Sequence, residues 1–378
     1  MTTRYDVIVI GVGGMGAATV AHLADRGVDV LGLERYDVPH DYGSSHGNSR
    51  IIRKAYFEDP AYVPLLERAY ELWDELEAGH DGPLLHRTGS LEVGPPDCSL
   101  IEGSTRSCEE HGLEHERLSS DELVERFPAY DVPHEYVGLY QPDGGLLDPE
   151  ECTVAHVNRA HRAGATIRAR ERIVGWQPTP DDGVRVETVE DAYEADRRVI
   201  TAGAWAARFV DELADVLVPE RQVVGWFQPT APERFTPESF PVWLFEGPEG
   251  YFYGFPTHGV PGVKLGKYHH REETIDPDAF EREPKPEDER VLRSFLERYF
   301  PEANGPTMRL ETCIFTNTPD EHFVLDTLPD QPQVAVGAGF SGHGFKFASV
   351  VGEILADLAL EGETDHEIGM FSLERFQN

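Results

Sequence analysis

The sequence predicts an α/β protein of two interleaved domains, one with parallel strands alternating with helices and one built on a mixed, largely antiparallel sheet. Two observations predict this fold. Glycine-rich strand-to-helix turns lie near both ends of the chain, and short alternating segments broken by Pro and Gly fill residues 223–268. We therefore expect the first domain to comprise residues 1–86, 146–220 and 321–378, and the second to comprise residues 87–145 and 221–320.

The first domain opens with the element order of a Rossmann-like fold. Residues 5–10 (YDVIVI) form a short β-branched run, a helical pattern continues to Ala24, and residues 28–33 form a second strand-like run. This order predicts a β–turn–α–β unit.

The turn in this unit has the pattern G-x-G-x-x-G at Gly11, Gly13 and Gly16. Such glycines permit a tight turn, close approach of a pyrophosphate and close helix–strand packing. Glu34 ends the second strand, where an acid accepts hydrogen bonds from a ribose. The motif predicts a bound dinucleotide; Glu34 argues against NADP but does not separate NAD from FAD.

The remaining elements follow from periodicity, glycines and prolines. Helices are expected over residues 62–76, 102–127, 287–300 and 345–360. Strands are expected over residues 84–93, within 164–199, over 199–203 and 334–339, and, in the antiparallel sheet, over 223–228, 242–245, 251–255 and 263–268.

Composition narrows the function classes. The 378 residues carry a net charge of −36, which repels nucleic acid and anionic lipid, so neither is expected as a partner. No apolar run of 18 residues and no signal-peptide pattern occurs, which favours a cytoplasmic protein. The acidic residues are dispersed and only five residues are lysine. We interpret this surface as adaptation to a very salty cytoplasm; an ordinary acidic protein is the alternative.

Metal and disulfide chemistry is not expected. The four cysteines are widely spread and form no C-x-x-C motif, and a Cys98–Cys108 bridge is disfavoured in a reducing cytosol. A metal site at His269 and His270 lacks a third ligand at suitable spacing.

Three further segments suit a ligand site. Residues 43–53 (GSSHGNSRIIR) place two arginines beside glycine and serine, which suits anion contacts, although a solvated basic patch is the alternative. Cys313 stands at the start of an expected polar loop, residues 312–323. Residues 337–346 (GAGFSGHGFK) form the second glycine-rich turn, whose backbone N–H groups can point at a ligand.

These segments, with RQVVGWF, YFYGFP…VKLG and TCIFTNTPDEHFVLD, resemble the monomeric sarcosine oxidase family almost over the full length of the chain. This family of flavoproteins includes N-methyltryptophan oxidase and pipecolate oxidase. The resemblance implies FAD as the cofactor, a monomer, and oxidation of an N-methyl or cyclic amino acid by O₂ to an imine and H₂O₂.

The resemblance also implies residue roles. Cys313 matches the cysteine bonded to the flavin, Arg53 and Lys346 match the pair that holds the substrate carboxylate, and Lys264 matches the lysine at which oxygen is activated. His46 and Arg50 match residues flanking the flavin, Tyr253 matches an active-site tyrosine, and Glu34 matches the ribose-binding acid. The other residues expected to contact the cofactor are Gly11, Val12, Gly13, Gly14, Met15, Gly16, Arg35, Ser44, Ser49, Ile173, Gly203, Trp205, Gly342, Gly344 and Phe345.

Two positions depart from the family pattern. Phe315 replaces the tyrosine of the sarcosine-specific enzymes, which removes a hydroxyl and favours a larger apolar substrate. The family's active-site histidine lies four residues after the lysine, where this chain has Tyr268. If the strand stays in phase, Tyr268 and His270 share a face with Lys264, whereas a one-residue bulge brings His269 inward, the position we assign to catalysis.

Two other functions remain open at this stage. A dehydrogenase of the same fold would pass its electrons to another carrier, and a flavin-binding protein without turnover would serve as a scaffold or sensor. An NAD enzyme is disfavoured by Cys313 and the second glycine turn.

Overall fold

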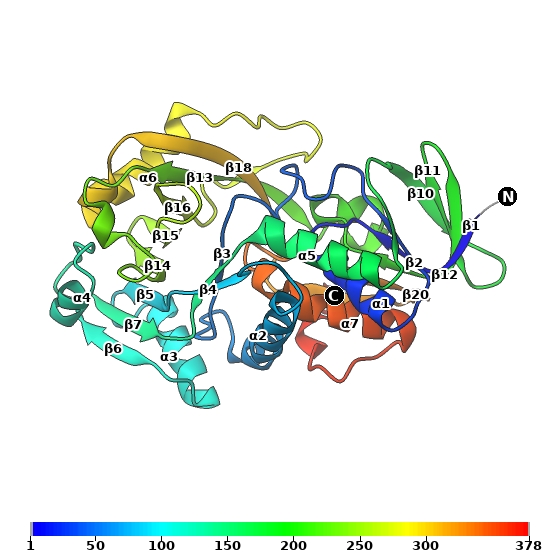
Figure 1. The fold of residues 1–378 in the computed structure, drawn as a ribbon, viewed down its shortest axis with the longest axis horizontal. Coiled ribbons are helices and arrows are strands. Elements are labelled where there is room, and N and C mark those ends of the chain that lie inside the picture. Colours follow the sequence, from blue (N-terminus) through cyan, green and yellow to red (C-terminus); the bar gives the residue numbers. More distant parts are fainter. Residues whose placement is uncertain (1–2, 377–378) are drawn as a thin grey trace.

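The computed structural model describes residues 3–376 and contains two large sheets with a small one between them (Figure 1). The eight-stranded sheet lies on the right in Figure 1 and the nine-stranded sheet on the left. Each large sheet draws strands from separate parts of the chain. The predicted fold class is therefore confirmed.

The eight-stranded sheet has a parallel centre. Ile10 lies beside Leu33 on one side and beside Ile200 on the other, so three strands end at the same edge. Residues that follow these strands consequently meet there. The parallel order is β9 (Thr166–Arg168), β2 (Val30–Leu33), β1 (Thr3–Ile10), β12 (Ala192–Ile200) and β20 (Gln331–Ala338), with β19 (Val324–Leu328) antiparallel to β20 and the hairpin β10 (Ile173–Pro178) and β11 (Val184–Thr188) beside β12.

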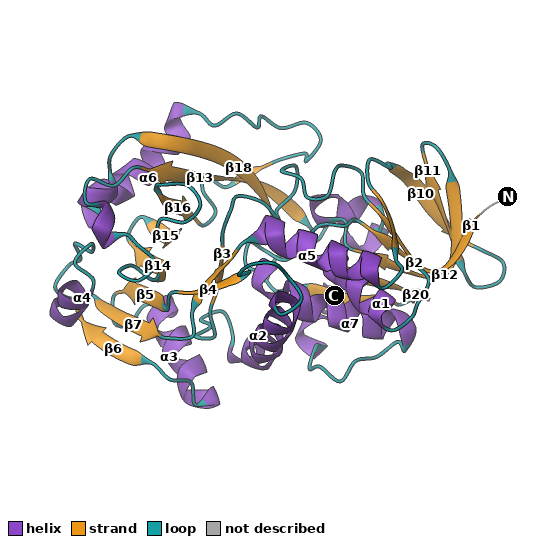
Figure 2. Cartoon of the chain, in the orientation of Figure 1, coloured by secondary structure: helices purple, strands orange, loops and turns teal. Residues whose placement is uncertain are grey.

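Helices cover this sheet and bury its apolar side chains (Figure 2). Close packing depends on small residues: a Cβ on Gly352 would lie 2.6 Å from Ala18, so helices α1 and α7 pack with almost no side chain between them. The helices are α1 (Gly14–Asp25), α2 (Val63–Glu77), α5 (Pro149–Arg162) and α7 (Ala348–Leu360).

The nine-stranded sheet is antiparallel except where β14 pairs with β5. Helix α6 (Pro286–Tyr299) packs on it through Phe295, whose ring stacks 3.9 Å from that of Phe252. The strands, in order, are β17 (Glu273–Thr274), β13 (Val218–Phe227), β16 (Val263–Lys267), β15 (Gly250–Phe255), β14 (Val242–Gly247), β5 (Ser90–Gly94), β7 (Val137–Gln141) and β6 (Glu116–Ser119), with β18 (Thr307–Asn317) beside β13.

The small sheet consists of β3 (Arg50–Ile52), β8 (Gly145–Leu147) and β4 (Leu85–Arg87). It lies between the two large sheets in Figure 1. The remaining helices are α3 (Ser99–His111), α4 (Ser120–Arg126) and the 3₁₀ turns Pro60–Tyr62, Gly203–Arg208, Asp211–Leu213, Pro232–Arg234, Pro301–Ala303, Phe345–Phe347, Gly369–Phe371 and Leu373–Phe376.

Several sequence predictions are wrong in detail. The helix expected over 102–127 is α3, strand β6 and α4, because β6 buries only Leu118 and carries little strand signal. The strand expected over 84–93 divides into β4 and β5, which belong to different sheets. Cys313 lies inside β18 rather than in a loop. None of the helices in the described residues has the length and hydropathy of a bilayer span.

Candidate functional site

A cavity of about 570 Å³ is lined by residues from both large sheets and joins the two glycine-rich turns. Most of the predicted site residues lie in its wall. Three do not: Gly16, Ser49 and Lys264 lie behind it. Those in the wall are Gly11, Val12, Gly13, Gly14, Met15, Glu34, Arg35, Ser44, His46, Arg50, Arg53, Ile173, Gly203, Trp205, Tyr253, His269, Cys313, Phe315, Gly342, Gly344, Phe345 and Lys346.

The first glycine turn forms one end of the cavity. Gly11 has φ +90°, and a Cβ there would lie 2.6 Å from the Thr201 carbonyl oxygen. A Cβ on Gly16 would lie 1.8 Å from the Gly11 carbonyl oxygen, so Gly16 is required for packing and not for contact with a ligand. Gly13 is open, because a Cβ there would lie 3.9 Å from its nearest neighbour, Ser45 Oγ. The Gly14 N–H at the start of α1 donates to Ser45 Oγ at 3.2 Å, and the space at Gly13 leaves room for an anion at this helix N-terminus.

Glu34 lies at the same end, where β2 stops, and is 5% exposed. Its carboxylate accepts hydrogen bonds from the backbone N–H groups of Val12 and Tyr36, both at 2.9 Å. These two bonds fix the carboxylate at the edge of the cavity. Arg35 and Trp205 stand at the rim, where both donate to Asp278, at 2.7 and 2.8 Å.

The second glycine turn approaches the first. A Cβ on Gly14 would lie 2.8 Å from the Phe345 ring, so the start of α1 and the turn after β20 are in contact. Gly342 has φ +80°, and a Cβ there would lie 2.4 Å from the Phe315 ring. Glycine is therefore required at Gly342 both by its backbone conformation and by Phe315.

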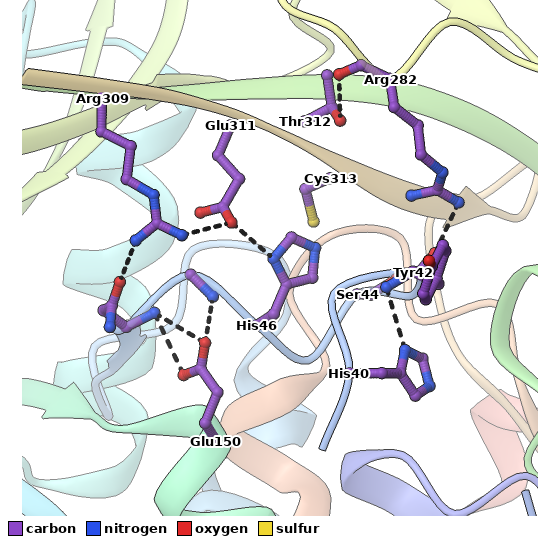
Figure 3. A network of polar contacts seen from close by, with 12 residues as sticks. His40, Tyr42, Ser44, His46, Glu150, Arg282, Arg309, Glu311, Thr312 and Cys313 are labelled. Carbon is purple, nitrogen blue, oxygen red and sulfur yellow. Dashed lines mark hydrogen bonds and ion pairs between the residues drawn. The ribbon is translucent and has the colours of Figure 1, made fainter. Parts of the chain in front are cut away.

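His46 and Cys313 line the cavity, and Glu311 lies beside His46 (Figure 3). Glu311 and Cys313 alternate along β18 and so share a face. His46 Nδ1 lies 3.6 Å from Glu311 Oε1, and Arg50 Nη2 lies 3.8 Å from Cys313 Sγ. Within the described residues, neither ring nitrogen of His46 has a hydrogen-bond partner, although the side chain is 4% exposed.

These contacts set the protonation of the pair. Burial alone would lower the pKa of His46, but Cys313 and Glu311 raise it to about 9. Burial alone would raise the pKa of the Cys313 thiol, but His46 and Arg50 lower it below its ordinary value. The arrangement therefore makes the Cys313 thiol easier to ionise, and the thiolate is the reactive form of cysteine.

Lys264 lies behind this wall and is 2% exposed. Its Nζ donates to the carbonyl oxygens of Gly47 and Ser49, at 2.7 and 2.9 Å, and to Ser49 Oγ at 3.0 Å. Burial, with Arg50 next, lowers the pKa of Lys264 well below its ordinary value. Three acceptors match the three N–H groups of an ammonium ion.

Gly47 is the point where these groups meet. Its φ is +98°, and a Cβ there would lie 3.6 Å from Arg50 Nη1, 3.6 Å from Glu311 Oε2 and 3.8 Å from Lys264 Nζ. Its N–H donates to Glu150 at 2.6 Å. The loop is thus fixed by Glu150 at the Gly47 N–H and by Lys264 at the Gly47 carbonyl oxygen.

Arg53 and Lys346 form the other end of the cavity. Arg53 Cζ lies 4.5 Å and Lys346 Nζ lies 5.1 Å from the centre of the same ring, Tyr56. Both cations are buried. Arg53 Nη2 already donates to Glu58, at 2.9 and 3.1 Å, and Lys346 Nζ donates to the His343 carbonyl oxygen at 2.7 Å. Burial, with Arg53, lowers the pKa of Lys346 to about 7.

The structure decides which residue after Lys264 faces the cavity. Strand β16 ends at Lys267, and His269 then adopts φ +51°. As a result both Tyr268 and His269 line the cavity, while His270 points away and lies 3.3 Å from Asp288. Of the two open alternatives, the in-phase arrangement does not hold for His270, because the strand ends before it.

His269 is not a free base. Its Nδ1 lies 2.9 Å from Glu220 and its Nε2 lies 3.1 Å from Glu321. Hydrogen bonds to these two carboxylates raise the pKa of His269 to about 9. At neutral pH both ring nitrogens therefore donate, and the side chain adds positive charge to the wall.

Sequence reasoning missed three acidic residues of the site: Glu58, Glu150 and Glu311. Glu150 follows Pro149 at the start of α5, a helix that the sequence pattern does not predict, so nothing marks its position. Glu311 is detectable in principle, because it lies two residues before Cys313 and shares its face once a strand is assumed.

Comparison with known proteins shows the family of the chain. Residues 6–358 match the family model described as FAD dependent oxidoreductase. The chain belongs to that family. FAD is accordingly its cofactor, as expected from the sequence, and the glycine turns and Glu34 provide the cradle that a dinucleotide requires.

Relatives within the FAD-dependent oxidoreductases cover the whole chain. The monomeric sarcosine oxidase of Streptomyces avermitilis is 43% identical, over 99% of this chain and 98% of the relative. The N-methyl-L-tryptophan oxidase of Escherichia coli is 36% identical, over 99% and 100%. Among solved structures, NikD, an amino acid oxidase of nikkomycin biosynthesis, is 28% identical with a TM-score of 0.85, over 98% of each chain.

Proposed function

We propose that the protein is an FAD-dependent oxidase of an N-substituted α-amino acid, which yields an imine, then an aldehyde and an amine, while O₂ is reduced to H₂O₂. One observation carries the proposal: a single cavity joins the dinucleotide-type glycine turn to a buried Arg53–Lys346 pair. Sarcosine oxidase and N-methyltryptophan oxidase relatives support the reaction class. When bound, FAD supplies the two-electron acceptor, and the residues supply binding and charge.

We propose that Cys313 is the covalent attachment point of FAD. The low thiol pKa beside His46 and Arg50 supports this role, as does the position of Cys313 in the cavity wall. The remaining wall residues of the glycine turns, with Glu34, hold the rest of the cofactor.

The substrate carboxylate is proposed to bind Arg53 and Lys346. Arg53 presents a planar fork that fits a carboxylate, and Lys346 adds a point charge. Since Arg53 Nη2 donates to Glu58 and Nη1 donates to the Ala55 carbonyl oxygen, an incoming carboxylate has to replace Glu58 at Nη2.

The cations also favour the neutral form of the substrate amine, which is the form that is oxidised. Tyr253 and Phe315 line the same cavity, and the apolar Phe315 ring favours a substrate with a side chain larger than that of sarcosine.

Affinity for a carboxylate should fall as the pH rises through about 7, the pKa of Lys346. Lys346 is a cation below that pH and neutral above it. We expect the inhibition constant of a simple carboxylate without an amine, such as propionate, to rise by at most about tenfold per pH unit. The Lys346→Gln variant should show a flat profile; an unchanged slope in that variant would mean that another group titrates.

The reaction class is tested by its products. In air, N-methyl or cyclic amino acids should give equal amounts of H₂O₂ and of imine-derived carbonyl product. Arg53→Met should raise KM far more than it lowers kcat, because it removes binding common to the ground state and the transition state. Consumption of amino acid without peroxide would contradict an oxidase.

We also propose the two-domain division at residues 86/87, 145/146, 220/221 and 320/321, a monomeric state, and adaptation of the surface to a cytoplasm of high salt. All strands of the eight-stranded sheet lie in the first set of residues, and all strands of the nine-stranded sheet lie in the second except for residues 218–220 of β13, which supports the division. The boundaries 86/87 and 145/146 fall within β4 and β8 of the small sheet. The net charge of −36 supports the salt adaptation.

Salt should stabilise the folded protein. The Debye length falls from about 10 Å at 0.1 M salt to about 3 Å at 1 M, which screens repulsion among the acidic side chains. We expect Tm, followed by circular dichroism, to rise steadily from dilute buffer to molar KCl. Sucrose serves as the uncharged control. A Tm that is constant or falls with KCl would refute the adaptation.

A further inference from the structure

A cluster of three potential metal ligands lies outside the cavity. It consists of His86, Asp148 and His258, whose ligand atoms all lie within 4.8 Å of one another. His86 Nε2 lies 2.9 Å from Asp148 Oδ2, and His258 Nε2 lies 2.6 Å from Asp148 Oδ1. The two imidazole rings are 4.5 Å apart. None of the three residues lines the cavity.

The fold positions these side chains from three segments. His86 in β4 pairs with Leu146 in β8. Asp148 lies two residues after Leu146, directly after β8 ends, so the side chains of His86 and Asp148 lie on the same face. Asp148 is also the N-cap residue of α5. His258 comes from the loop after β15, where Phe255 packs against Leu146. The geometry is thus held by backbone pairing and apolar packing.

The donor set has the composition of a transition-metal site. Two neutral imidazoles and one carboxylate bind Zn²⁺ and related divalent ions, and a three-ligand site leaves coordination positions for water. Zn–N distances of about 2.0–2.1 Å and Zn–O distances of about 2.0–2.2 Å require ligand atoms about 3–3.5 Å apart, so a small adjustment suffices. The side chains are 20–26% exposed, which leaves a route from solvent.

The orientation of the side chains also suits a cation, because both imidazoles direct Nε2 at the Asp148 carboxylate. A metal ion would take the place of the Nε2 protons, which are released to solvent on binding.

We propose that His86, Asp148 and His258 form a binding site for a divalent first-row transition ion, with Zn²⁺ as its representative. An ion held there would join the loop after β15 to strand β4 and to the N-terminus of α5. Because these segments belong to different sheets, the bound ion should stabilise their junction.

The test is titration of chelator-treated holoenzyme with Zn²⁺ in competition with a chromophoric chelator. We expect His86→Ala and His258→Ala each to weaken one site by at least about tenfold. His134→Ala is the matched control, because His134 also lies near a carboxylate, 3.8 Å from Asp121, but its side chain is 88% exposed. Zn²⁺ should raise the Tm of the wild type and of the control but not of the two site variants.

Co²⁺ provides a readout that does not depend on stability. A visible d–d spectrum should form in the wild type and in His134→Ala, and be lost in His258→Gln, which keeps a polar side chain of similar size. Unchanged Zn²⁺ affinity in the site variants, or no binding at millimolar Zn²⁺, would overturn the proposal. The cluster would then be a hydrogen-bonded ion pair that links the same segments.

Discussion

Lys264→Met should slow the reaction of the reduced enzyme with oxygen by about 10²–10³-fold, while reduction by the amino acid stays close to the wild-type rate. The reason is charge in a buried site: Lys264 Nζ is held by Gly47 and Ser49, and methionine keeps the length of the side chain but not the cation. The negative charge that develops on oxygen would then have no buried cation beside it. Stopped-flow mixing of anaerobically reduced enzyme with aerated buffer measures this rate.

Lys267→Met is the matched control, since Lys267 belongs to the same strand but is only half-buried. It should leave both half-reactions unchanged. In the wild type, oxygen reactivity should fall as the pH rises through the lowered pKa of Lys264, because the cation is then lost. Wild-type reoxidation in Lys264→Met would show that oxygen reacts elsewhere.

Cys313→Ala should release all FAD from the polypeptide on acid precipitation, whereas wild-type protein should retain it. The prediction follows from the thiol's place in the wall beside His46 and Arg50. Absorbance of the precipitate and supernatant, together with the mass of the denatured chain, measures attachment. Cys152→Ala is the control, because Cys152 is buried and burial raises its pKa well above the ordinary value.

Glu311→Gln should weaken, but not prevent, the covalent attachment of FAD to the polypeptide. Glu311 lies 3.6 Å from His46 Nδ1 and helps to raise the pKa of His46 to about 9. Glutamine at position 311 should slow the attachment of FAD to the apoprotein without abolishing it. The effect should be strongest at high pH, because His46 in the variant loses its proton at a lower pH than His46 in the wild type. Equal attachment rates in the variant and the wild type at every pH would show that the charge of Glu311 has no role in attachment.

Much of the fold is predictable because local patterns and tertiary packing agree. The glycine turn at Gly11, with its flanking strands, needs no distant contact to be recognised. Helix α5 is hard to predict because its buried face consists of small and polar residues such as Thr153, Ala155 and His156, which give weak periodicity. Strand β18 resembles a loop in sequence because three Thr, one Glu and one Asn interrupt its apolar residues.

The site is predictable only in part, since position in sequence does not give contact in space. Family resemblance pairs Arg53 with Lys346, and the shared contact with Tyr56 gives that pairing a physical basis. Glu58 on the Arg53 fork could not be foreseen. The choice among the residues after Lys264 depends on where β16 ends, which is a property of the sheet and not of the local sequence.

Anaerobic mixing of the purified protein with N-methyl and cyclic amino acids in molar KCl, followed by air, tests the central claim most directly. We expect at least one of these amino acids to bleach the flavin absorbance, and colour to return with release of H₂O₂ when air is admitted. Bleaching without return would indicate a dehydrogenase that uses another electron acceptor. Absence of bleaching by every N-substituted amino acid would contradict the proposed substrate class.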